Sequence, residues 1–180
     1  MSLWSSIEHG PSPALRAGSV RVTRRVKAQP DRVFDAWLDA EAARTFLFAL
    51  RTDDPVDSEM DPRVGGRFRI AQRGASGDVE YVGEFLAVDR PYRLVFSLFV
   101  EKYAQRDDRV MLELAPVGQE SLLVLTHEYD LSSETQRARI QAGWETTLDG
   151  LASLCGEPAP RVSTPRPNTP GFGRLEADFV

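Results

Sequence analysis

Apolar and polar residues alternate in several short segments of this chain, and glycine or proline residues separate most of these segments. In residues 20–26 the valines Val20, Val22 and Val26 share one parity. A period of two is typical of a strand that buries one face. Six later segments have the length of a strand and are bounded by turn residues: 55–60, 67–73, 79–88, 93–101, 109–115 and 121–129. The pattern therefore predicts seven strands in an antiparallel sheet.

Helical spacing occurs between the first two of these strands. Pro30 is compatible with the first turn of a helix, where a backbone N–H has no partner in any case. Asp39 can cap a second helix that runs to about Phe46. The apolar residues of the first segment lie on one helical face: Val33, Phe34, Trp37 and Leu38. Two short helices are therefore predicted in this connection.

A longer helix is predicted near the end of the chain. Ser132 and Ser133 are suitable N-caps, and Gly156 is a suitable end. Gly143 is expected to let this helix approach the sheet closely. Residues that can be buried recur at helical spacing: Ile140, Trp144, Thr147, Leu148, Leu151 and Leu154.

These elements predict one α+β domain over residues 19–156, in which the long C-terminal helix lies across a curved sheet. Residues 1–18 read as an N-terminal arm, and residues 157–180 as a Pro-rich C-terminal tail, whose Phe172, Leu175 and Phe179 are expected to dock on this subunit or on another. Residues 94–100 are apolar on both parities, unlike a strand that faces water on one side. Either a second subunit, in a homodimer, or the terminal segments are expected to cover that outer face.

Composition narrows the classes of partner. The chain of 180 residues carries 22 Lys and Arg against 27 Asp and Glu, a net charge of −5. Binding to nucleic acid or to an anionic membrane depends on a basic surface, so neither is expected. No apolar run approaches the ~20 residues that span a bilayer, and the N-terminus has no export pattern, so a cytoplasmic location is expected. A single cysteine, Cys155, rules out an internal disulfide.

The sequence offers few groups for catalysis. His9, His127 and Cys155 are too few and too scattered for a metal site, and neither a phosphate-binding loop nor a serine-hydrolase motif is present, so no metal or cofactor is expected. His127 shares parity with Leu123 and Leu125 and is the one weak catalytic candidate, as an acid or base. The alternative is a strand-end histidine bonded to the backbone or to a neighbouring carboxylate.

Five stretches of the chain form an ordered set of motifs: Gln29–Trp37, Val64–Phe68, Gly83–Phe96, Leu123–His127 and Gly143–Leu151. In this order they resemble the family of heat-shock protein 90 ATPase activator homologues, within the polyketide cyclase, START-like and plant-allergen (SRPBCC) superfamily. The matching residues run from about 19 to 155, and each stretch alone is weak. The resemblance implies a helix-grip (START-like) fold with an internal cavity: a curved antiparallel sheet, two short helices and a long C-terminal helix.

Three functions follow as hypotheses. The first is non-enzymatic binding of a small hydrophobic molecule between sheet and helix, in a space lined by Phe68, Ile70, Phe85, Phe96, Leu98, Leu112, Leu125, His127, Trp144 and Leu148. The second is an enzyme of cyclase or hydrolase type that uses His127 as acid or base. The third, which follows only from the family resemblance, is a module that interacts with the chaperone.

Overall fold

The computed structural model describes residues 18–47, 55–72, 77, 79–100, 108–130 and 133–156. The strands and helices of this part end within about two residues of the predicted bounds. In chain order they are β1 (Gly18–Val26), α1 (Pro30–Leu38), α2 (Ala40–Phe46), β2 (Pro55–Met60), β3 (Arg67–Gln72), β4 (Val79–Asp89), β5 (Arg93–Val100), β6 (Asp108–Val117), β7 (Glu120–Tyr129) and α3 (Glu134–Gly156).

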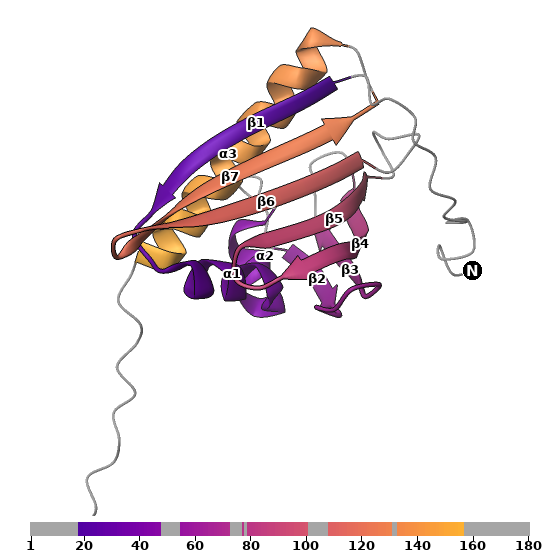
Figure 1. The fold of residues 1–180 in the computed structure, drawn as a ribbon. Helices are drawn as coiled ribbons and strands as arrows, with labels where there is room; N and C mark the ends of the chain where they lie inside the picture. Colours follow the sequence, from indigo (N-terminus) through magenta and orange to yellow (C-terminus); the bar gives the residue numbers. More distant parts are fainter. Residues whose placement is uncertain are drawn as a thin grey trace, which may run out of the picture.

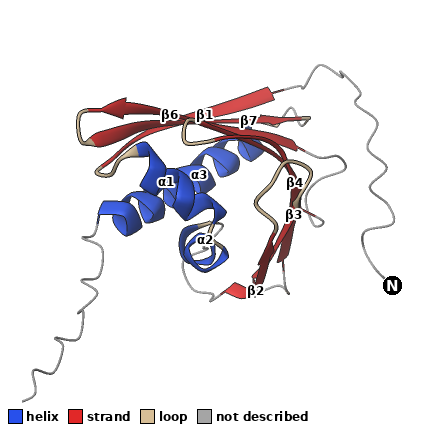
Figure 2. Cartoon of the chain, turned by 60° about the horizontal axis from the view of Figure 1, so that its bottom comes forward, coloured by secondary structure: helices blue, strands red, loops and turns tan. Residues whose placement is uncertain are grey.

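The strands form one seven-stranded antiparallel sheet in the order β1-β7-β6-β5-β4-β3-β2. The last strand, β7, therefore pairs with the first, β1, and α3 lies against β1 (Figure 1). Seen from below, the sheet turns sharply at β4 and β3, so that its concave face encloses all three helices (Figure 2). This is the helix-grip arrangement that the sequence predicted.

The bend of the sheet has a local cause in β4. The pairing of β4 with β5 shifts by one residue between Phe85 and Ala87, and such a bulge increases the local twist. Gly83 lies just before it, opposite Phe68. A Cβ atom on Gly83 would stand 1.9 Å from the Ser97 carbonyl oxygen and 2.6 Å from the Phe68 ring. Only glycine therefore allows β5 and the Phe68 ring to come so close to β4.

A glycine pair extends the contact between β3 and β4. Gly65 has a φ of 77°, which favours glycine, and its N–H donates to the Phe85 carbonyl at 2.8 Å. The Phe85 N–H in turn donates to the Gly66 carbonyl at 2.9 Å. A Cβ on Gly66 would lie 2.1 Å from the Asp61 carbonyl oxygen. The pair thus holds the turn before β3 against the bent part of β4.

Burial alternates along the strands and defines the concave face. On β7 the odd-numbered residues from Ser121 to Tyr129 are buried, and the residues between them are at least partly exposed. β5 differs, because Val95 and Ser97 are buried as well as Leu94 and Phe96. The apolar run over residues 94–100 predicted that both faces of this strand are covered. Of the two predicted covers of the outer face, the terminal segments 1–18 and 157–180 lie almost wholly outside the described residues, and a second subunit stays a prediction.

The helices begin as the sequence predicts. Pro30 occupies the first turn of α1, and the Asp39 side chain accepts a 2.8 Å hydrogen bond from the Ala42 N–H at the start of α2. Burying the apolar face of α1 stabilises it against the sheet. In α3 the buried residues are Trp144, Thr147, Leu148, Leu151 and Cys155.

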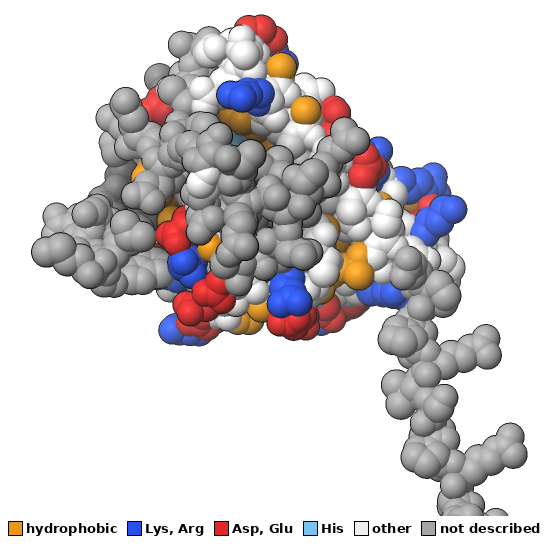
Figure 3. Space-filling model, turned by 180° about the vertical axis from the view of Figure 1, so that it is seen from behind, with side chains coloured by type: hydrophobic (Ala, Val, Ile, Leu, Met, Phe, Trp, Pro, Cys, Tyr) orange, Lys and Arg blue, Asp and Glu red, His pale blue; other side chains and the backbone are white. Residues whose placement is uncertain are grey.

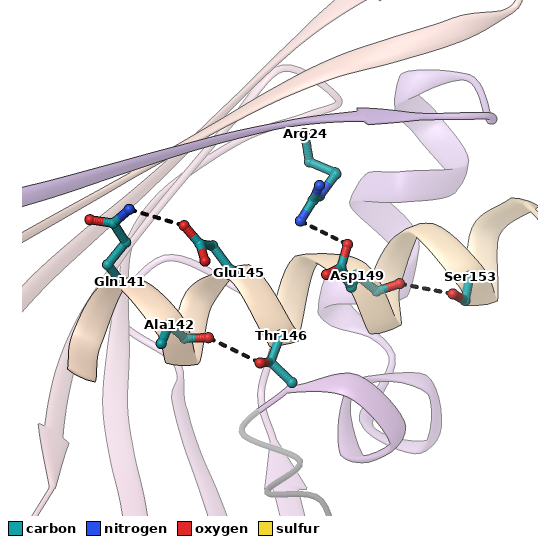
Figure 4. A network of polar contacts seen from close by, with 7 residues as sticks. All are labelled: Arg24, Gln141, Ala142, Glu145, Thr146, Asp149 and Ser153. Atoms are coloured by element: carbon teal, nitrogen blue, oxygen red, sulfur yellow. Dashed lines mark hydrogen bonds and ion pairs between the residues drawn. The ribbon is translucent and has the colours of Figure 1, made fainter. Parts of the chain in front are cut away.

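Hydrogen bonds link residues within α3, and one ion pair joins α3 to β1 (Figure 4). Arg24 occupies the inward position between Val22 and Val26 on β1, and its guanidinium reaches Asp149 of α3 at 2.7 Å. Within the helix, Gln141 donates to Glu145 at 3.0 Å, and the Thr146 and Ser153 hydroxyls donate to carbonyls one turn back. The ion pair explains why the apolar alternation of β1 is interrupted at one position.

The expectation about Gly143 is wrong. A Cβ atom at this position would meet no atom of the described residues within 4 Å, because Gly143 lies on the exposed side of α3. The close approach occurs two turns later, at Gly150, where a Cβ would stand 3.0 Å from Cβ of Phe46 in α2. The small residue is therefore needed where α3 crosses α2, not where it crosses the sheet.

Candidate functional site

The side chains predicted to line a ligand site are all in the interior, between the concave face and the helices. Each is at most 4% exposed. All but one belong to the hydrophobic core, and His127 lies next to it on β7. These residues come from strands β3, β4, β5, β6 and β7 and from α3: Phe68, Ile70, Phe85, Phe96, Leu98, Leu112, Leu125, His127, Trp144 and Leu148.

Aromatic rings form a continuous row through this interior, which we call the aromatic row. It consists of Trp144, Trp37, Phe96, Phe68 and Phe85. The Trp37 ring lies 6.4 Å from that of Trp144 and 6.1 Å from that of Phe96, measured between centroids. The Phe96 ring then contacts Phe68 edge-on at 5.5 Å, and Phe85 at 6.4 Å. The row links α3, α1 and the bent part of the sheet with large apolar surfaces.

A chain of polar groups begins at the α3 end of the aromatic row. Trp144 Nε1 donates to His127 Nδ1 at 2.8 Å, and His127 Nε2 lies 3.0 Å from Asp108 Oδ2. The His127 side chain is 5% exposed and that of Asp108 is 18% exposed. These polar groups therefore link the buried side of α3, through β7, to the start of β6.

This arrangement fixes the tautomer of His127. An indole N–H can only donate, so Nδ1 of His127 must be the acceptor and carries no hydrogen. In the neutral ring the hydrogen is then on Nε2, from which it is donated to the Asp108 carboxylate. Both ring nitrogens are thus bonded to protein groups. An acid–base role for His127 would require one of these two bonds to break first.

Of the three hydrogen-bonded residues, Asp108 is the one that was not predicted from the sequence. The strand was predicted to begin at Arg109, one residue too late. Val110, Leu112 and Leu114 are the buried residues of β6, and extending their parity back by two positions reaches Asp108. His127 is directly opposite Val110, so Asp108 is its diagonal neighbour on the same face. Parity alone could have found the pair.

The other indole of the described interior, that of Trp37, differs in its hydrogen bonding. Trp37 is 2% exposed, and its Nε1 has no hydrogen-bond acceptor in the part of the chain that the structure describes. The sequence analysis placed Trp37 on the buried face of a helix but gave no reason to expect an unpaired N–H. No local sequence signal exists for it, since the surrounding residues come from distant elements.

Several polar residues of the sheet point away from the interior. Arg69 pairs with Asp57 at 2.9 Å and also with Glu80, and the hydrogen bond to Glu80 is the main reason that the pKa of Arg69 lies above its usual range. Arg67 and Glu113 have the outward parity of their strands and are exposed. On the opposite side from the view of Figure 1, acidic and basic side chains are interspersed along the lower edge (Figure 3).

A family comparison identifies the chain. Residues 27–156 match the model of the family described as activator of Hsp90 ATPase homolog 1-like protein. The chain belongs to this family. The matched segment contains the three described helices, strands β2 to β7, the polar chain and the aromatic row, whereas β1 lies before it. A comparison with curated proteins found no match.

Solved structures share the fold of this Hsp90 ATPase activator homologue family member. A protein of Chromobacterium violaceum superposes with a TM-score of 0.70 at 24% identity, over 78% of this chain and 99% of the other. A protein of Arthrobacter aurescens gives 0.67 at 18% identity, over 79% and 88%. CalU16 of Micromonospora echinospora gives 0.58 at 28% identity, over 76% and 75%. These similarities confirm the helix-grip, START-like fold.

Three further observations concern metal binding, thiol reactivity and membrane spans in this family member. Among the described residues, no three His, Cys, Asp or Glu side chains are grouped so that they could hold a metal ion. Burial raises the pKa of the Cys155 thiol above its usual range, which disfavours the reactive thiolate. None of the helices in the described ranges is long and apolar enough to cross a membrane.

Proposed function

We propose that this protein binds a small, largely apolar molecule in the interior between the concave face of the sheet and α3. The observation that carries the proposal is the convergence of the predicted lining residues on the aromatic row, with the polar chain of His127 at one end. Binding sites for small molecules are mostly lined by apolar and aromatic side chains, with few polar groups. The START-like fold of the family supports the same proposal.

His127 has a positioning role in this proposal. Its ring holds the Trp144 indole through Nδ1, and this bond fixes the orientation of the first ring of the aromatic row. A ligand that contacts the Trp144 face then meets a fixed surface, which lowers the entropic cost of binding. The family takes its description from activators of the Hsp90 ATPase, and for this chain that role stays a prediction.

Thermal unfolding in the presence of a panel of lipids, hydrocarbons and flat aromatic compounds tests the proposal. Any compound that binds only the folded state raises the melting temperature. Two variants of β7 distinguish binding in the interior from binding on the outer face of the sheet, because Leu125 is fully buried, whereas Leu122 faces outward and is 37% exposed. Leu125→Val should change which compound size stabilises most, and Leu122→Val should not. If no compound raises the melting temperature of the wild type, the proposal is wrong.

A further inference from the structure

The unpaired indole of Trp37 indicates the chemical class of the ligand. We propose that Trp37 Nε1 donates a hydrogen bond to the ligand, and that the ligand is a neutral apolar molecule carrying an acceptor oxygen, such as a carbonyl or ether oxygen. This inference rests on the proposed function and adds to it the group that orients the molecule. It assigns to α1 a direct binding contact.

The comparison of the two interior tryptophans carries the argument. The rings of Trp37 and Trp144 are 6.4 Å apart, and both side chains are at most 4% exposed. Nε1 of Trp144 donates to His127, whereas Nε1 of Trp37 has no acceptor among the described residues. Buried tryptophan N–H groups usually have a partner, so this exception calls for an acceptor from outside the chain.

The surroundings of Trp37 define the rest of the ligand. Its ring contacts Phe46 edge-on at 5.4 Å, and also Phe96 and Trp144. A molecule whose oxygen meets the N–H would therefore have aromatic surfaces around its other atoms. Flat or compact hydrocarbon skeletons fit this environment better than polar ones.

The charge of the buried residues requires a neutral ligand. Among the described residues that are buried, none is Lys, Arg, Asp or Glu, and the polar ones are Ser97, Ser121, His127 and Thr147. No buried described residue is a cation, and the inward Arg24 of β1 is already paired with Asp149, so a ligand carboxylate would have to compete for it. Burial of an unpaired charge is strongly unfavourable. An ammonium group would present hydrogens to an N–H that can only donate. A neutral acceptor satisfies both conditions.

Matched ketones and hydrocarbons test the inference: fluorenone against fluorene, and indanone against indane. Each pair keeps the ring skeleton and differs in one carbonyl oxygen. The ketone should bind about tenfold more tightly, which corresponds to about 1.4 kcal/mol. In proton–nitrogen correlation spectra of the wild type, the Trp37 indole signal should move downfield with the ketone only. The Trp144 indole signal, already hydrogen-bonded to His127, should move less.

Trp37→Phe removes the donor and should abolish the preference for the ketone. Tyr92→Phe is the matched control, since Tyr92 is 54% exposed on the β4–β5 turn, and it should keep the full preference. Equal affinity for ketone and hydrocarbon, or an unmoved Trp37 signal, overturns the inference but leaves the binding function in place. This is the result expected if a trapped water, and not the ligand, accepts the hydrogen bond from Nε1. If neither member of either pair binds while other compounds of the panel do, the inference is overturned and the binding function stands; if no compound binds, both fail. The wild-type spectra decide the matter even if the Trp37 variant does not fold.

Discussion

The orientation of Trp144 depends on a single acceptor atom, Nδ1 of His127. That atom is buried and would have no partner if the indole N–H were removed. A buried polar atom left unpaired lowers stability by about 1–3 kcal/mol. The same bond dictates that His127 carries its hydrogen on Nε2, where the Asp108 carboxylate accepts it.

Trp144→Phe should therefore lower the free energy of unfolding by about 2 kcal/mol or more, since the lost hydrogen bond adds to the lost ring volume. Asp108→Asn is the matched comparison, because an amide oxygen can still accept from Nε2, and it should have a smaller effect. Urea unfolding of both variants measures this difference. The tautomer can be checked independently from the nitrogen chemical shifts of the His127 ring; a hydrogen on Nδ1 would contradict the assigned chain.

Cys155 offers a second test at the scale of one residue. It is the only cysteine of the chain and is 2% exposed, so labelling reports on it alone. Because burial raises the pKa of its thiol, alkylation by iodoacetamide at neutral pH should be slow in the folded protein and fast in urea. The buried neutral thiol therefore stabilises the folded state fully at pH values below the pKa of an unfolded cysteine, about 8.5. This stabilisation is lost as the pH rises through the higher pKa of the thiol in the folded state. Equal alkylation rates in the folded and unfolded protein would contradict this account.

At the scale of elements, Gly83 and Gly143 differ in whether packing requires a glycine, although each is the first residue of a stretch that resembles the family. Gly83 lies where β4 bends, and an added Cβ would collide with the backbone of β5. Gly143 lies in α3, where no atom of the described part of the chain is close enough to obstruct a Cβ. Both belong to stretches by which the sequence resembles the family, yet only the first is required by packing.

Gly83→Ala should destabilise the protein by about 3 kcal/mol, because β5 or the Phe68 ring must move. Gly143→Ala should stabilise it by about 1 kcal/mol, since alanine has the better helix propensity and nothing obstructs its Cβ. Chemical denaturation of the two variants measures both changes. A stabilised Gly83→Ala variant would show that β4 and β5 are not held so closely.

The elements themselves could be predicted because each depends on local periodicity. The strand ends and both short helices follow from alternation, Pro30 and Asp39, and the inward residues of β7 follow from parity. The polar chain could be predicted only in part, because it joins β6, β7 and α3, and a one-residue error at the start of β6 hides Asp108. The unpaired Trp37 N–H could not be predicted, since it depends on which distant side chains surround it.

At the scale of the whole molecule, the bend of the sheet and the long helix together enclose the aromatic row. The paired β1 and β7 support α3 on one side, and the bent strands β4, β3 and β2 turn toward the helices on the other (Figure 2). The family's fold fixes this enclosure, while the lining residues determine what can be held in it. A binding function therefore belongs to the side chains of the interior rather than to the fold as such.

Native mass spectrometry tests the central claim most directly. Spectra of the freshly purified protein, and of protein incubated with the ligand panel, should show the chain with one small molecule bound, and denaturation should release that molecule. The occupied fraction should fall when Trp37 is replaced by Phe and should be unchanged in Tyr92→Phe. Spectra that show only the mass of the free chain, before and after incubation, would contradict the proposal that the interior of this protein binds a small molecule.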